Sequence, residues 1–387
     1  MADVSIQHPL EECLKTDLAT WEIGPYDAAL PGPMKLRLSL DGEVVVSAAY
    51  ETGFLHRGLE KAFEQQPWRA VVAYSDYLDT DGSIFGELAV CLAVEEIARI
   101  EVPRRGQYVR VLLSELGRIS AHLGYIVRVA KAMNAETIIH YVLRDRERVL
   151  DLFELATGAR YTLNYLRFGG IQTDITDGFV ERVLEVCELF RVRLKEYNDL
   201  FTYNHAFLKR TQGLGVLSAD RAAALGVTGP NGRASGHAFD VRKAHPYSGY
   251  DLFDFAVPSA GGIERDEGAS VGDANDRFLL RLREISTSVD LLKQAAEGIP
   301  SGEFNYFGWG EKAIIPSGEA YSRVETSRGL LGCHVVSDGG PSPTRIQFRP
   351  PSLAHFSAIP ELVKGIRLED LPVLLATLDP GISEADR

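Results

Sequence analysis

The chain has 387 residues, of which 45% are hydrophobic and 25% are charged, so it holds ample material for a large core in one large or two medium-sized domains. Its formal net charge of -13 at pH 7 argues against a nucleic-acid partner, because phosphate backbones require a basic face.

The four cysteines, Cys13, Cys91, Cys187 and Cys333, lie far apart and form no Cys-x-x-Cys pair. This usage is typical of a reduced, intracellular protein with buried thiols. It excludes a nickel–iron centre, which requires two such pairs. No apolar run approaches the ~20 residues that cross a bilayer, and residues 1–17 lack the basic start and apolar stretch of a signal peptide. We therefore expect a soluble chain that meets a membrane only through partner subunits.

A β-hairpin is predicted near the N-terminus. Residues 34–40 alternate apolar with charged or polar side chains, Asp41-Gly42 follows, and Val44-Val45-Val46 begins a second run. Period-two alternation broken by Asp-Gly is the strongest short-range hairpin signal. We assign residues 1–22 to an N-terminal extension and residues 23–52 to a β-hairpin layer.

Three segments then carry apolar side chains at alternating steps of three and four residues, which predicts amphipathic helices. They cover residues 109–130, 183–201 and 278–296, and shorter helices are expected at 86–101 and 138–157. Pro103 suits the first turn of the first long helix. The buried stripes must face one another, so we predict a helix bundle built from residues 86–210 and 276–297.

Two further segments complete the predicted architecture. Residues 213–275 are rich in glycine and proline but hold Tyr247, Tyr250, Phe253 and Phe255, which predicts ordered irregular structure with apolar anchors. Strand-like runs at 331–336 and 345–348 predict a C-terminal β layer and tail over residues 319–387. The expected fold class is α+β.

Several motifs favour a structural interpretation over a chemical one. Residues 229–236 (GPNGRASG) lack the strand–turn–helix context and the Gly-Lys-Ser/Thr of a phosphate-binding loop, so we expect a turn. The spacing of His237 and His245 matches no zinc site. The charged run at 144–148 indicates a solvated or subunit-facing helix surface. No nucleophile motif is present, which favours a subunit over a free enzyme.

The order of three segments resembles the D-type subunit of the proton-pumping NADH–quinone oxidoreductase, respiratory complex I. These segments are the loop 24–32 (GPYDAALPG), residues 53–61 (GFLHRGLEK) and residues 74–80 (YSDYLDT). Similar motifs stand at 115–123, 144–154, 158–160, 164–167, 169–170, 233–236, 240–244, 246–250, 318–321, 336–340 and 386–387. The resemblance covers residues 23–387 as a single domain. It implies a fold like that of nickel–iron hydrogenase large subunits, with the metal lost and the cavity converted to a quinone site.

The functional residues implied by the resemblance carry over unevenly. Gly53, His56, Arg57, Gly58, Glu60 and Lys61 stand as the family motif expects, and Asp379 begins a segment that looks like the hydrogenase Asp-Pro-Cys-x-x-Cys ending with both cysteines changed. The quinone-binding histidine of the family falls at Pro31 and its aspartate partner near Ala132. The headgroup tyrosine falls at Thr80, the arginine before it at Tyr77, and a histidine beside the terminal iron–sulfur cluster at Thr162.

The resemblance implies a quinone-module subunit of a membrane-associated enzyme, peripheral on the cytoplasmic face of the cell membrane. Its partners would be an iron–sulfur subunit, other peripheral-arm subunits and a membrane-arm subunit, which would hold the iron–sulfur clusters, FMN and NAD. This chain would bind no cofactor or metal, with quinone as the substrate.

Two interpretations stay open for the cavity. Quinone reduction consumes two electrons and two protons and needs hydrogen-bond donors near the carbonyl, which proline and alanine do not supply. In the first interpretation Tyr77, three residues before Thr80 and on the same face of a helical turn, takes over as the donor. In the second the chain is a structural paralogue that assembles but does not reduce quinone by the usual residues. A nickel–iron hydrogenase is rejected on the cysteines.

Overall fold

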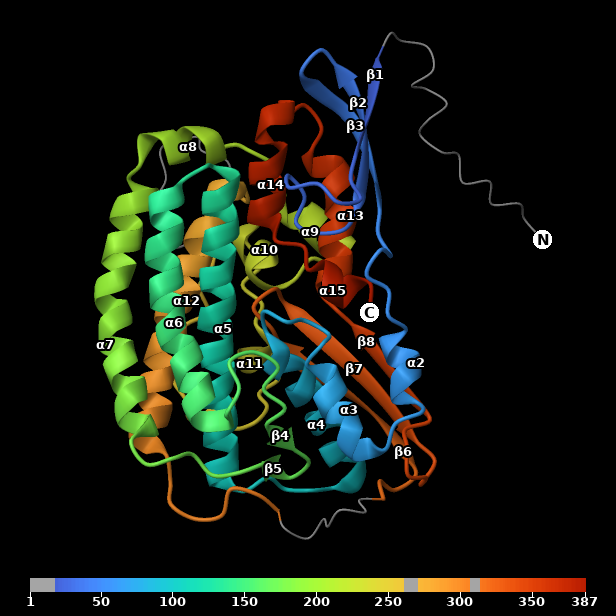
Figure 1. Ribbon diagram of the computed structural model, residues 1–387, viewed down its shortest axis with the longest axis vertical. Helices are drawn as coiled ribbons and strands as arrows, with labels where there is room; N and C mark the ends of the chain where they lie inside the picture. Colours follow the sequence, from blue (N-terminus) through green and yellow to red (C-terminus); the bar gives the residue numbers. More distant parts are fainter. Residues whose placement is uncertain (1–17, 261–270, 307–313) are drawn as a thin grey trace, which may run out of the picture.

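A bundle of four long helices forms one half of the molecule (Figure 1). The computed structural model describes residues 18–260, 271–306 and 314–387. The bundle helices are α5 (Arg104–Ala132), α6 (Glu136–Thr157), α7 (Phe179–Tyr197) and α12 (Ala274–Gly298). Their apolar stripes are buried against one another, as the spacing predicts. The helix expected to reach residue 201 ends at Tyr197 and continues as one π-helical turn, η1 (Asn198–Thr202).

The N-terminal sheet has three antiparallel strands in the order β1-β2-β3. They are β1 (Ala19–Ile23), β2 (Lys35–Asp41) and β3 (Val44–Glu51). The predicted hairpin is confirmed, with its turn at Asp41-Gly42. β1 begins inside the segment that we assigned to an extension. Four of its five residues are exposed, so this edge strand lacks the alternation that identifies a half-buried strand.

Three helices connect this sheet to the bundle. They are α2 (Leu59–Phe63), α3 (Trp68–Ser75) and α4 (Ser83–Ala98). α4 is buried along most of its length and packs against the C-terminal sheet and α5. That sheet is antiparallel, in the order β6 (Gly318–Glu325), β7 (Leu330–Ser337) and β8 (Arg345–Arg349). The predicted C-terminal β layer is therefore confirmed.

The tail after this sheet is largely helical, which the sequence patterns did not predict. It forms α13 (Ser352–Leu362), the 3-10 turn η4 (Leu368–Asp370), α14 (Leu371–Leu378) and α15 (Ile382–Ala385). α13 packs against β3, and α14 packs against α5 and α12. Sequence periodicity missed α13 and α14 because each is apolar on most faces and holds a proline, Pro360 and Pro372.

The described part of 213–275 is ordered, as predicted, and includes short helices. α8 (His205–Thr211) precedes it, and α9 (Ala219–Leu225), α10 (Gly229–Ala234), α11 (Val241–Ala244) and η2 (Tyr250–Leu252) lie within it. The buried side chains of Tyr250, Phe253 and Phe255 anchor it. The turn expected at 229–236 is wrong, because a proline in the first turn starts the buried helix α10 there. A two-stranded ribbon, β4 (Leu166–Arg167) and β5 (Gly170–Ile171), completes the fold.

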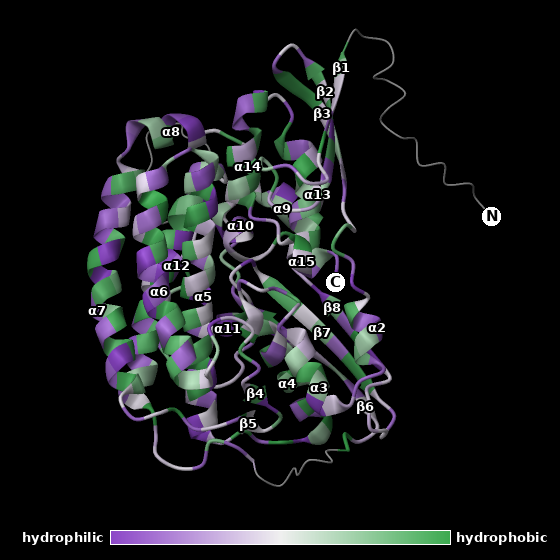
Figure 2. Cartoon of the chain, in the orientation of Figure 1, coloured by the Kyte–Doolittle hydropathy of each residue, from purple (hydrophilic) through white to green (hydrophobic). Residues whose placement is uncertain are grey.

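Two apolar clusters hold these parts together. The larger joins the bundle to the C-terminal sheet, and the smaller joins the N-terminal sheet to α13 and α14. Figure 2 shows the mixed hydropathy of the long helices, whose hydrophilic residues lie among hydrophobic ones on every bundle helix. Within the described ranges, no helix is both long and apolar enough to span a bilayer. The C-terminus ends between the two sheets (Figure 1).

Candidate functional site

The His-Arg-Gly motif clasps the C-terminal end of the chain. The backbone N–H of Leu55 donates to Asp386 Oδ2 at 2.9 Å. His56 Nδ1 lies 2.9 Å from the carbonyl oxygen of Asp386, which requires a proton on that nitrogen. The Arg57 guanidinium donates to the carbonyl oxygen of Ser383 at 2.9 Å. His56 and Arg57 therefore fix the path of the last residues.

Glu60 ties the same tail to the edge strand β8. Its Oε1 accepts from the Phe348 N–H at 2.9 Å and from Arg387 Nε at 2.6 Å. Its Oε2 accepts from Arg345 Nη2 at 3.1 Å. One carboxylate thus satisfies a backbone donor of the sheet edge and the last residue of the chain.

The remaining motif residues have simpler roles. Gly58 caps α2 with a φ of 62°, in the left-handed region where a side chain is strained, which accounts for the glycine. Gly53 also has a positive φ, 108°. The Lys61 ammonium pairs with Glu64 and its side chain is 73% exposed, so it does not face the tail.

Asp379 lies in a buried cluster of ion pairs. Its carboxylate contacts Arg128 Nη2 at 2.8 Å and Arg328 Nε at 3.3 Å. The same two arginines reach Asp81 Oδ2, at 2.7 and 3.1 Å, and Arg328 also pairs with Asp79. Burial alone would raise the pKa of Asp379, but the two guanidinium groups hold it below its ordinary value. The cluster joins four distant segments: the loop after α3, helix α5, the β6–β7 turn and the C-terminal segment.

A small pocket lies beside this cluster. Thr80, Asp81, Arg146 and Tyr161 are among the residues that line it, and its volume is about 10 Å³, room for roughly one water molecule. Arg146 donates to the Tyr161 hydroxyl at 3.1 Å and lies 5.5 Å from the ring centroid. The pocket has no space for a quinone ring within this chain alone.

Tyr77 and Thr80 both have exposed side chains, but they do not share a helical turn. α3 ends at Ser75, and the Tyr77 N–H closes a tight turn onto the Tyr74 carbonyl at 3.2 Å. The backbone leaves the helical path after Ser75, where Leu78 is buried and Asp79 forms an ion pair with Arg328. The helical geometry that we expected for this pair is therefore wrong.

Pro31 and Ala132 flank the same region without supplying donors. A Cβ added to Gly32 would lie 3.0 Å from Ile382 Cδ1, so the loop that contains Pro31 packs on the C-terminal segment. Ala132 is the last residue of α5, one turn beyond Arg128, and packs against the smaller apolar cluster. Their side chains shape this face and cannot donate a proton.

Thr162 is half-buried in the loop between Tyr161 and Leu163, which both line the small pocket. A pair of buried carboxyl groups holds the start of the next segment. Asp76 Oδ2 accepts from the Asn164 N–H at 2.8 Å, and Glu87 Oε2 accepts from the Leu166 N–H at 2.6 Å. Burial, reinforced by the adjacent Asp76, raises the pKa of Glu87 well above its ordinary value. One proton held between these carboxyl groups therefore fits their close approach.

Residues from four of the other motif segments, 115–123, 233–236, 240–244 and 246–250, join a second, fully buried charge network. Arg233 Nη2 lies 2.6 Å from Glu284 Oε1, and Arg242 Nη1 lies 3.0 Å from Glu115 Oε1. The network also includes Arg118, His122, Asp240, Tyr250, Ser288 and Glu325. Burial would raise the pKa of Glu115, but Arg118 and Arg242 lower it to about 2. The network is an internal scaffold, which explains why these motifs accompany the fold.

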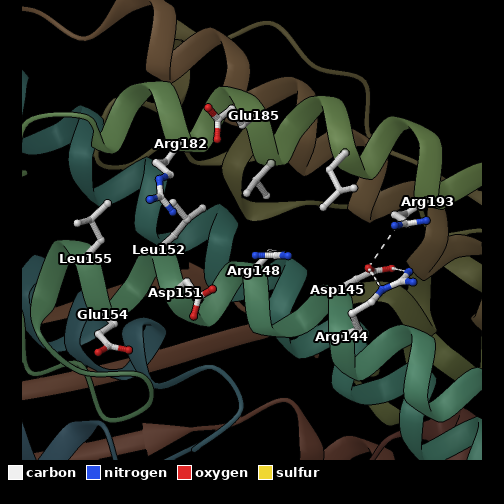
Figure 3. A pocket seen from close by; sticks show the side chains of 12 residues that line it. Arg144, Asp145, Arg148, Asp151, Leu152, Glu154, Leu155, Arg182, Glu185 and Arg193 are labelled. Atoms are coloured by element: carbon white, nitrogen blue, oxygen red, sulfur yellow. Dashed lines mark hydrogen bonds and ion pairs between the residues drawn. The ribbon is translucent and has the colours of Figure 1, made fainter.

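Three residues of the charged run, Arg144, Asp145 and Arg148, line an open groove between α6 and α7 of about 740 Å³ (Figure 3). Asp145 is buried and accepts from the Tyr197 hydroxyl at 2.7 Å, with Arg193 Nε at 3.3 Å. Arg148 and Arg182 point into the space between the helices (Figure 3), and Asp151 and Glu185 also line the groove. The groove is a charged helix surface that is separate from the Asp379 cluster.

The described residues offer no grouped set of metal ligands. Residues 18–260, 271–306 and 314–387 hold no group of three or more His, Cys, Asp or Glu side chains that could bind a metal ion. Cys91, Cys187 and Cys333 are buried free thiols, as expected, and Cys13 lies outside the described residues.

Sequence reasoning missed three residues that complete the cluster. Arg128 and Arg328 supply its positive charge, and Glu384 is a buried carboxyl beside it. Arg128 lies one turn before Ala132 but on the face opposite the apolar stripe that we predicted to be buried, so no local pattern marked it. Arg328 and Glu384 stand in a turn and in the C-terminal segment, where no periodic pattern marks them.

The chain resembles known proteins along almost its whole length. The family model of the respiratory-chain NADH dehydrogenase 49 kDa subunit matches residues 133–308 and 302–387. The second D-type subunit of NADH-quinone oxidoreductase from Chloroflexus aurantiacus is 38% identical, covering 96% of this chain and 95% of the relative. The D-type subunit of the same enzyme from Desulforamulus reducens is 36% identical, covering 96% of this chain and 99% of the relative.

A solved structure agrees with these relatives. A chain of an archaeal respiratory membrane complex, the membrane-bound sulfane sulfur reductase, superimposes with a TM-score of 0.89 and 34% identity, covering 98% of this chain and 100% of that chain. The chain therefore belongs to the 49 kDa subunit family of respiratory-chain NADH dehydrogenase, the family that includes the D-type subunits of NADH-quinone oxidoreductase.

Proposed function

We propose that this chain is the quinone-module subunit of a multi-subunit respiratory membrane complex that oxidises NADH and reduces quinone. The observation that carries the proposal is that the residues matching the family's functional positions contact one segment, residues 379–387, directly or through Arg328. His56, Arg57 and Glu60 hold that segment from one side. Asp79 and Asp81, which flank Thr80, hold it through Arg328. A structural paralogue gains no support from relatives that bear the names of redox subunits.

The quinone site is completed by a partner subunit. The pocket of about 10 Å³ beside Thr80 is far smaller than a quinone ring, whereas ligand pockets for such molecules measure about 300–1,000 Å³. Tyr74, Tyr77 and Tyr161 expose 39%, 48% and 50% of their surface near this pocket. Aromatic side chains are enriched at protein interfaces, so an iron–sulfur subunit that packs on 74–83 and the hairpin would close the cavity.

The rest of the assembly follows from the family. We propose that other peripheral-arm subunits and a membrane-arm subunit carry the FMN, NAD and membrane contacts, and that this chain binds no cofactor itself. Its place is then peripheral, on the cytoplasmic face of the membrane. We also propose that residues 23–387 form one domain, since α5 contributes to both apolar clusters through its contacts with α12 and α14.

A second candidate substrate has a specific observation behind it. Pro31 and Ala132 stand where the family has its quinone-binding histidine and the aspartate partner of that histidine, and a neighbour with a TM-score of 0.89 is a chain of a sulfane sulfur reductase. A complex of this architecture with a sulfur compound as acceptor would need no quinone-binding histidine.

Purification through a tag on this chain separates these functions. The complex, extracted in mild detergent, is expected to contain an iron–sulfur subunit and to reduce a short-chain quinone with NADH. A complex that reduces polysulfide but not quinone supports the second candidate. An intact complex that reduces neither would make the chain a structural subunit.

A further inference from the structure

Glu384 is a buried carboxyl at the inner side of the Asp379 cluster. Only 1% of its surface is exposed. Its Oε1 accepts from the Ser352 N–H at 3.3 Å and from the Ser352 hydroxyl, at the start of α13. A Cβ added to Gly381 would lie 3.1 Å from Glu384 Cγ and 3.2 Å from Arg328 Nε. Glu384 and Arg328 therefore converge on the same point of the C-terminal segment.

The carboxyl groups here outnumber the guanidinium groups that contact them. Four carboxyls (Asp79, Asp81, Asp379 and Glu384) face three guanidinium groups (Arg128, Arg146 and Arg328). Each aspartate contacts an arginine. Across the described ranges, by contrast, no lysine or arginine is ion-paired with Glu384. The group approaches neutrality when one carboxyl keeps its proton.

Burial and the surrounding charges favour Glu384 and Asp79 as the two carboxyl groups that share that proton. Burial and the charge of Asp79 raise the pKa of Glu384 to about 7, against the opposing effect of Arg328. Burial also raises the pKa of Asp79. His355, on α13, is neutral because burial lowers its pKa to about 3, and Arg281, on α12, acts on Asp379 from farther away. The proton is therefore gained and lost in the neutral range.

We propose that Glu384 and Asp79 form a proton store that delivers one of the two protons consumed when quinone is reduced at this site. The inference rests on the proposed function. Two electrons pass from the partner subunit's iron–sulfur cluster to the quinone, and two protons convert it to quinol. One proton leaves the store, which becomes fully ionised and regains a proton from water, and the second comes from solvent. Asp81 is 26% exposed and pairs with both Arg128 and Arg328, so it is the member of the cluster that contacts solvent.

The test uses the complete complex purified through a tag on this chain. Infrared difference spectra recorded during a pH titration detect the carbonyl stretch of a protonated carboxyl group, and quinone reduction is measured over the same pH range. The variants are Glu384→Gln, which keeps the shape but cannot release a proton, and Asp79→Asn. Glu361→Gln is the matched control, because it changes an exposed carboxyl at the far end of the helix that Ser352 begins.

The wild-type complex should show a carboxyl band that titrates near pH 7 and a rate that falls above that pH, where the store is empty. Glu384→Gln should remove the band, lower the rate on the order of 10²-fold at about pH 6 and flatten the pH dependence. Glu361→Gln should change neither. An assembled Glu384→Gln complex with the wild-type rate and pH profile overturns the proposal.

Two further outcomes are decisive. If Glu384→Gln does not assemble, the wild-type spectrum decides, and the absence of a band that titrates between about pH 6 and 8 overturns the store. If the wild-type complex reduces no quinone but the band titrates and is lost in Glu384→Gln, the proposed function fails while proton storage is upheld.

Discussion

Glu60→Ala should loosen the C-terminal segment without unfolding the chain. The change removes the acceptor of the Phe348 N–H, whose residue is 1% exposed, and leaving a buried donor unpaired costs about 1–3 kcal/mol. It also removes contacts with Arg345 and Arg387, which are 42% and 20% exposed, so each is discounted to about 0.2–1 kcal/mol. The local free energy of opening should therefore fall by about 3 kcal/mol, which is roughly a hundredfold in the opening equilibrium.

Hydrogen exchange followed by mass spectrometry measures this opening in the assembled complex. Peptides that contain Phe348 and residues 382–387 should exchange about a hundredfold faster in Glu60→Ala, with exchange in α12 unchanged. Glu64→Gln is the control, since Glu64 shares the Arg345 partner but bonds neither the backbone of β8 nor Arg387. If both peptides of Glu60→Ala exchange at the wild-type rate, Glu60 does not hold the C-terminal segment against β8.

Three further changes test other parts of the structure. Arg233→Met leaves Glu284 and Glu325 buried without their shared partner, so it should destabilise the fold by about 3–5 kcal/mol in thermal unfolding, and adding Glu284→Gln should recover part of the loss. Full stability of the single variant would contradict this. Tyr77→Phe should slow quinone reduction on the order of 10²-fold if its phenol donates to the quinone, and an unchanged rate removes Tyr77 from the chemistry. Burial raises the pKa of Glu384 from 4.5 to about 7 in the folded chain. Ionisation of Glu384 therefore destabilises the fold, and this loss of stability increases from pH 4.5 to about pH 7 and is constant above about pH 7. Glu384→Gln should therefore raise the free energy of unfolding by about 3 kcal/mol at about pH 8 and leave it unchanged at about pH 4. An equal change in the free energy of unfolding at both pH values would exclude the raised pKa.

Local patterns in the sequence predicted most of the fold. The hairpin was visible because Asp41-Gly42 interrupts an alternating run, and the bundle because each long helix buries one stripe. The pattern failed where burial surrounds an element, as in α13 and α14, and where an element is mostly exposed, as in β1. In neither case do apolar residues gather on one face and polar residues on the other, which is the pattern that periodicity detects.

The site was only partly predictable, for a different reason. The resemblance identified His56, Arg57, Glu60 and Asp379, and the structure brings them to one segment of the chain. The charges that give this segment its chemistry come from residues far apart in sequence, since 251 residues separate Arg128 from Asp379 and 249 separate Asp79 from Arg328. Such pairs leave no spacing signal, and only the packed fold shows which carboxyl lacks an arginine partner.

Photoaffinity labelling tests the central claim most directly, that quinone is bound and reduced at the face formed by segments 74–83 and 379–387. The purified complex is illuminated with an azido-quinone that it also reduces, and the labelled peptides are identified by mass spectrometry. We expect labels on these two segments and on the neighbouring iron–sulfur subunit, all prevented by excess unmodified quinone. A complex that reduces the azido-quinone but carries its competitive labels on other subunits alone would contradict the assignment.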